Sequence, residues 1–215
     1  MTWKYDSGLP SPMRTLVRNA VIAKLQPLTR ACGGWLEAVI PIGFSIKGPH
    51  DELGIDLLWN ELGGRTPAIA VATTSLKPDD TGAPDTSRGR LTFELYLVSS
   101  HRRGLTEGRT AGDVAAAGSN AADPGLDAAL ELAWMYLLGV DLGVGPQVAD
   151  PRFVEEDEIV ADNEKTIWQQ TWRVWLTRDV DQLRASVQKL TGLRTTLKPT
   201  GNEPEARHIV VDSVL

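Results

Sequence analysis

The sequence predicts an α+β fold in which an antiparallel or mixed sheet carries packed helices. Apolar residues alternate over residues 91–98, the period of a strand, and recur at helical spacing over 13–28 and 126–138. The elements are interspersed, but they do not alternate strictly enough to require a parallel sheet. We expect a main domain over residues 1–178 and a C-terminal extension of helix, linker and strand over 179–215.

The first half of the chain predicts two helices and two strands. Ser11 can cap the first helix, and Pro12 can occupy its first turn. Glycine pairs or proline end each helix. In chain order, the expected elements are a helix over residues 13–28, a strand over 35–46, a short helix over 53–62 and a compact strand over 68–73.

A long loop and the most regular helix follow the alternating strand. Residues 102–122 contain many small residues without periodicity, which is typical of a long loop. The helix begins at Asp123-Pro124 and stops at Gly139. Its expected apolar face consists of Leu126, Ala129, Leu130, Ala133, Trp134, Leu137 and Leu138.

The last third of the chain predicts a strand, a helix and a final strand. Residues 166–177 place tryptophans at a spacing that suits a helix or a strand, and their content of Thr, Ile, Val and Trp favours the strand. Asp179 can cap the following helix. The final apolar run, Ile209-Val210-Val211, is expected to pair as a strand, either within its own domain or as a clasp on a neighbouring subunit.

Two acidic stretches are interpreted as solvated loops. Residues 77–89 carry two prolines, two glycines and three aspartates. Calcium binding is disfavoured there, because the twelfth position counted from Asp79 is Arg90 rather than a bidentate glutamate. The second stretch has no glycine turn to wrap an ion. The acidic residues concerned are Asp79, Asp80 and Asp85 in the first stretch and Glu155, Glu156, Asp157 and Glu158 in the second.

Composition limits the class of protein. The chain has 215 residues and a formal net charge of −6, which argues against broad adhesion to DNA or to anionic membranes. No run approaches the ~20 apolar residues that span a bilayer, and residues 1–6 lack the pattern of a secretory signal. These features predict a globular protein made and kept in a cytoplasm, or assembled there into something larger, with no membrane partner.

The sequence shows no catalytic or cofactor motif. The glycine cluster at residues 139–145 follows a helix and lacks a lysine, so it does not resemble a phosphate loop. Ser45 has glycine on only one side of a possible nucleophile elbow. Cys32 is the single cysteine, and no histidine has a partner at metal-ligand spacing; the three are His50, His101 and His208. We therefore expect no cofactor, no metal and no enzyme activity.

The order of elements resembles the Mu-like phage tail terminator family over about residues 12–178. The resemblance is carried by an amphipathic first helix, the strand Thr66-Pro67-Ala68-Ile69-Ala70-Val71, a helix ending in Leu137-Leu138-Gly139-Val140 and a late strand from Trp168 to Leu176. It also includes the strand over 91–99 followed by Arg102-Arg103. The chain is similar, more distantly, to the minor tail protein that caps the tails of lambda-like phages.

The resemblance implies a structural protein of the virion tail. Such proteins form a homohexameric ring on the last ring of tail-tube subunits, end tube polymerisation and present a surface to the head–tail connector. DNA would pass through the ring without sequence-specific binding. The alternative is a small soluble α+β ligand-binding domain or enzyme whose site the sequence does not reveal.

The resemblance to tail terminators also suggests which residues lie at interfaces or line the channel. Arg102 and Arg103 could touch phosphate or a partner's carboxylate, or could simply be a solvated strand end. A ring of acidic subunits should have a net negative channel that repels DNA at short range. The acidic stretches named above are the candidates for this lining, with ordinary outward-facing charge as the alternative for each stretch.

Overall fold

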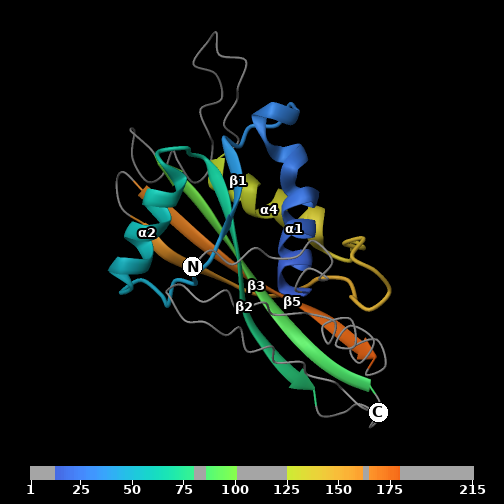
Figure 1. The fold of residues 1–215 in the computed structure, drawn as a ribbon. Helices are drawn as coiled ribbons and strands as arrows, with labels where there is room; N and C mark the ends of the chain where they lie inside the picture. Colours follow the sequence, from blue (N-terminus) through green and yellow to red (C-terminus); the bar gives the residue numbers. More distant parts are fainter. Residues whose placement is uncertain (1–12, 80–85, 101–124, 162–164, 180–215) are drawn as a thin grey trace, which may run out of the picture.

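The fold, seen in a computed structural model, is built on a five-stranded mixed sheet with strand order β1-β2-β3-β5-β4 (Figure 1). Three α-helices pack around the sheet, which confirms the predicted α+β class. The structure describes residues 13–79, 86–100, 125–161 and 165–179. Its main elements are α1 (Met13–Leu25), β1 (Ala38–Ile42), α2 (Glu52–Leu62), β2 (Ala68–Asp79), β3 (Thr86–Ser100), α4 (Gly125–Leu137), β4 (Arg152–Ala161) and β5 (Lys165–Asp179).

The sheet is mixed because of a single connection. β1 pairs with β2 in parallel, and α2 lies between them in the chain, as a crossover between parallel strands requires. The other three pairings are antiparallel. β3 and β5 are the central pair and match over their full lengths, from Thr86 opposite Asp179 to Ser100 opposite Lys165. β1 and β4 are therefore the two edges of the sheet.

The two faces of the sheet bury separate cores. α1 and α4 lie together on one face and α2 lies on the other (Figure 1). On the first face, Phe93 of β3 stacks on Trp172 of β5, with ring centroids 6.2 Å apart and nearly parallel planes. On the second face, Leu58 of α2 packs over a row of small residues in β2 and over Tyr96 of β3. Small β2 residues leave room for α2 to approach the sheet closely.

Three strands of the sheet continue past the ends of the two edge strands. β1 pairs with β2 only as far as Ala72, and β4 begins at Arg152, opposite Arg173. Past these points β2, β3 and β5 run on together, as Figure 1 shows for their lower ends. We call this extension the arm, and it consists of residues 76–79, 86–91 and 174–179.

The arm corrects the prediction of a loop over residues 77–89. β2 continues to Asp79, and β3 already begins at Thr86. Gly89 and its neighbours pair with β2 on one side and β5 on the other, so backbone pairing outweighs the local preference of proline, glycine and aspartate for turns. Only the tip of the predicted loop, at 80–85, lies outside the described residues.

The interpretation of Glu155–Glu158 as a solvated loop is also wrong, because these residues lie within β4. All four side chains are exposed. An edge strand has solvent beside it and is only partly covered on its faces, so it tolerates charges that a central strand would exclude. The register shifts twice along this strand, next to Phe153 and next to Glu158.

The remaining sequence predictions have mixed outcomes. The helix over 53–62 and the strand over 166–177 are confirmed, with small changes at their ends. The strand over 35–46 is confirmed only as the shorter β1. The loop over 102–122, the helix after Asp179 and the final strand lie outside the described residues, so the separate C-terminal extension stays a prediction.

Candidate functional site

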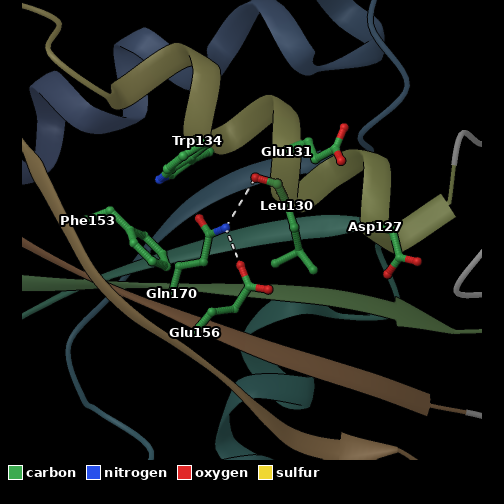
Figure 2. Close-up of a pocket in the computed structure, with 7 residues that line it drawn as sticks. All are labelled: Asp127, Leu130, Glu131, Trp134, Phe153, Glu156 and Gln170. Atoms are coloured by element: carbon green, nitrogen blue, oxygen red, sulfur yellow. Dashed lines mark hydrogen bonds between the residues drawn. The ribbon is translucent and has the colours of Figure 1, made fainter.

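A groove of about 460 Å³ lies between α4 and the edge strand β4. Figure 2 shows α4 above it and the strands below it. Four of its residues come from α4, two from β4 and one from β5, so the groove exists only where this helix crosses the sheet edge. The lining residues are Asp127, Leu130, Glu131, Trp134, Phe153, Glu156 and Gln170.

The buried Gln170 side chain holds the floor of the groove together. Its amide nitrogen donates to the backbone carbonyl of Leu130, at 3.2 Å, and to the carboxylate of Glu156, at 2.8 Å (Figure 2). Its amide oxygen accepts a 3.3 Å bond from the indole nitrogen of Trp172. One side chain of β5 therefore joins α4, β4 and the core, and it fixes the distance between the two walls.

One end of the groove is aromatic. Trp134 meets Phe153 edge to face with ring centroids 5.9 Å apart, and Phe153 meets Trp172 in the same way at 5.5 Å. Trp172 is buried in the core, whereas 43% of Trp134 is exposed. Aromatic contacts thus run from the core to the surface, and they hold the outermost ring in a fixed orientation.

The other parts of the groove wall are acidic. Asp127 and Glu131 lie on α4, four residues apart on one face of the helix, and Glu156 lies on β4. All three side chains are exposed. Carboxylates beside an exposed indole have the chemistry to attract a cation, above all the flat guanidinium group of arginine, which can stack and pair at once. We call these residues, with Trp134 and Phe153, the acidic groove.

The outer side of α4 next to the groove is unusually apolar. Met135 is 71% exposed, and Tyr136 and Leu138 are also exposed. The sequence assigns Trp134 and Leu138 to the apolar face of this helix, and the structure leaves both side chains exposed rather than in the core. The core takes only the narrower stripe formed by Leu126, Ala129, Leu130, Ala133 and Leu137.

The opposite face of the sheet carries a cluster of cations around the arm. Lys77 and Arg90 are paired neighbours in β2 and β3, and Arg90 is in turn paired with Trp175 of β5. Paired residues in neighbouring strands point to the same face of a sheet. By the same register, Arg88 and Arg173 lie on this face, and Arg152 lies beside Arg173. We call Lys77, Arg88, Arg90, Arg152, Arg173 and Trp175 the basic arm face.

The cations of the basic arm face have few partners. Within the described part of the chain, none of the five forms an ion pair. Arg152 stacks on Trp175, with the guanidinium carbon 5.5 Å from the ring centroid. The Nε atom of Arg90 is buried without a hydrogen-bond partner. α2 packs over the region of Ala68, Ala70 and Ala72, which leaves this end of the same face without a described helix above it.

The acidic run on β4 divides between the two faces. Glu156 is paired with Gln170 and belongs to the acidic groove, whereas Glu155 and Asp157 are paired with Thr171 and Gln169 on the other face. Asp79 ends β2 opposite Arg88, and β3 and β5 separate β2 from the run on β4. The structure therefore does not place the two acidic stretches in one cluster. Asp80, Asp85, Arg102, Arg103, Ile209, Val210 and Val211 lie outside the described residues.

A buried polar cluster lies under α2. Tyr96 is fully buried, and its hydroxyl donates to the Glu94 carboxylate and accepts from the backbone amide of Ile46, at 2.8 Å. Burial, and then the neighbouring Glu94, raise the pKa of Tyr96. Ser45 donates to Glu94 at 2.7 Å, so its partner is this carboxylate. The cluster anchors the segment between β1 and α2 to the sheet.

The sequence singled out only part of these surfaces. Asp127, Glu131 and Trp134 could have been found from their i, i+4 and i+7 spacing, which puts them on one stripe of α4. Gln170 carried no such signal, because its role depends on where α4 crosses β5. In the described part of the chain, no three His, Cys, Asp or Glu side chains are close enough to hold a metal ion.

The fold and these surfaces define a mixed-sheet α+β protein with an acidic groove on one face of its sheet and a cluster of cations on the other, where Glu155 and Asp157 also lie. None of the described helices has the length and apolar character needed to cross a membrane. The sequence matches no protein-family model and no curated protein.

Proposed function

We propose that this protein is a structural tail terminator of a phage or phage-derived particle, in which identical subunits form a ring that caps the tail tube. The observation that carries the proposal is a group of exposed apolar side chains at the C-terminal end of α4 and directly after it: Trp134, Met135, Tyr136 and Leu138. Several large exposed apolar side chains gathered in one short segment are typical of an interaction site. The resemblance of the element order to tail terminators supplies the kind of assembly.

The edges of the sheet support a protein that works through its surfaces. β4 is an edge strand of ten residues, and its acidic side chains keep it from pairing indiscriminately with other strands. An acidic edge still accepts a partner whose charge is complementary. The acidic groove and the basic arm face therefore favour specific contacts over nonspecific association.

In this proposal the ring sits on the last ring of tube subunits, ends tube growth and receives the head–tail connector. Six copies of a −6 chain carry about −36 in total, a charge that suits the passage of DNA through the ring. The protein is assembled in the host cytoplasm and ends in the virion tail.

The test is imaging and native mass spectrometry of the full chain, alone and with tail tubes. The expected result is six copies in a ring at the end of each tube. A Met135→Glu variant should lose the ring, because it places a charge in the apolar side of α4. Leu53→Glu on α2 is the matched control, because Leu53 is 72% exposed and Met135 is 71% exposed. A protein that stays monomeric with and without tubes contradicts the proposal.

One observation favours the alternative of a small ligand-binding domain or enzyme. The acidic groove has a volume in the range of small-molecule sites, and carboxylates and an amide converge on it. Its chemistry would suit a cationic ligand. Binding of guanidinium or amine compounds at micromolar concentration, lost in Glu131→Gln, would favour that alternative over the tail terminator.

A further inference from the structure

The basic arm face and the acidic groove lie on opposite faces of the same sheet. The groove opens on the face covered by α1 and α4, and the cations lie on the face covered by α2. Five cations gather on one side of a chain whose net charge is −6. Two complementary surfaces that point in opposite directions cannot satisfy each other within one subunit.

We propose that the basic arm face docks into the acidic groove of a second copy of this chain. The inference deepens the proposed function and rests on it, because it names the contact between neighbouring subunits of the ring. Arginine and lysine of one copy meet Asp127, Glu131 and Glu156 of the next. Trp134 offers its exposed ring to a guanidinium group at the same place.

The geometry suits a ring. A contact between two different surfaces of identical subunits is head-to-tail, and each subunit uses its groove for one neighbour and its arm for the other. Such contacts close into a ring when the rotation per subunit divides a full turn. The arm extends beyond the ends of β1 and β4, with residues 147–149 paired along its β5 edge, so its cations lie at one end of the sheet, where a neighbour can approach them.

Charge favours a second copy over nucleic acid as the occupant. A polyanion would neutralise the basic arm face, but it would leave the acidic groove and the exposed side of α4 without a partner. A second copy covers both surfaces in one contact. This contact also keeps the cations out of the channel, where they would bind the DNA backbone and slow its passage.

The test exchanges the charges of the two surfaces. An arm variant carries Lys77→Glu and Arg88→Glu, and a groove variant carries Asp127→Lys and Glu131→Lys; all four residues are exposed. Each variant alone places like charges in every contact, so its dissociation constant for self-assembly should rise at least about tenfold. An equal mixture of the two should assemble as the unchanged protein does, because every contact between unlike subunits is again complementary.

Matched controls reverse charge elsewhere on the described surface. Arg14→Glu with Lys47→Glu changes the net charge as the arm variant does, and Glu52→Lys with Glu61→Lys changes it as the groove variant does. Both controls should assemble normally. Circular dichroism of all four variants should show unchanged folding, because no substituted side chain is buried.

The outcomes separate the contact from the function. Rings that form normally in both charge-reversed variants overturn the contact and leave the tail terminator standing. Rings that behave as expected but never bind tail tubes overturn the tail function and leave the contact standing. An unchanged chain that remains monomeric both free at all concentrations and on tail tubes overturns both. DNA binding that the arm variant loses, without any change in assembly, overturns the contact in favour of nucleic acid.

Discussion

The Tyr96 hydroxyl lies 2.5 Å from a carboxylate oxygen of Glu94, and both side chains belong to one face of β3. The same hydroxyl accepts the backbone amide of Ile46, and Ser45 donates to the same carboxylate. A buried carboxylate is tolerated here because two hydroxyl groups donate to it. The pair therefore connects the sheet to the segment that leads from β1 into α2.

Replacement of Tyr96 by phenylalanine should destabilise the fold with little change in shape. The amide of Ile46 would lose its acceptor and Glu94 would lose one donor, so the free energy of unfolding should fall by about 1–3 kcal/mol. Urea denaturation followed by circular dichroism measures this change. Ser45→Ala is the milder comparison, because Ser45 is only partly buried. Equal stability of Tyr96→Phe and the unchanged protein would show that the cluster is not structural.

Removal of the Gln170 amide should loosen the acidic groove. In Gln170→Ala the carbonyl of Leu130 and the indole nitrogen of Trp172 lose their partner, at a cost of roughly 1–3 kcal/mol. Gln169→Ala is the neighbouring control, because Gln169 lies on the other face of β5 and is partly exposed. Denaturation curves should separate the two variants. An equal effect in both would mean that the amide does not hold α4 to the sheet.

Asp51 should make the start of α2 sensitive to acid. The backbone amides of Lys47 and Gly54 donate to its carboxylate and hold the pKa of Asp51 below its usual value of 3.8. Because the folded pKa is the lower one, the cap is fully stabilising above pH 3.8, and its contribution is lost as the pH falls through the folded pKa.

Hydrogen exchange of the amides at the start of α2 measures this effect. Their protection should decline below the usual pKa of Asp51 in the unchanged protein. Asp51→Asn keeps an acceptor oxygen that does not titrate in this range, so its protection should be independent of pH over the same window. The same decline in both proteins would assign the acid sensitivity to other groups.

Lysine substitution on β4 tests whether the acidic run lines a DNA channel. Glu155 and Asp157 are the suitable pair, because they lie on the face away from the acidic groove. If they line the channel, Glu155→Lys with Asp157→Lys should slow DNA ejection, and more at low salt than at high salt because ions screen the new attraction. Ejection at the same rate at every salt concentration, from particles with intact rings, would place the pair outside the channel.

The sequence by itself determined the fold class and the central elements. Alternation over Leu91–Val98 indicated β3, and helical stripes that end at glycine indicated α2 and α4. These signals are local, because a strand or a helix shows its buried side in its own periodicity. β4 carried no such signal, because its acidic residues are exposed on both faces and no stripe of buried side chains marks it.

Tertiary structure alone decided the surfaces. The arm forms because three segments pair past the ends of β1 and β4. This backbone pairing overrides the turn preference of the residues between Lys77 and Gly89. The acidic groove exists because Gln170 binds α4 and β4 at once, and the basic arm face gathers cations from four strands. Each of these features depends on register and helix placement, which are set by pairing between distant segments and not by the residues on either side.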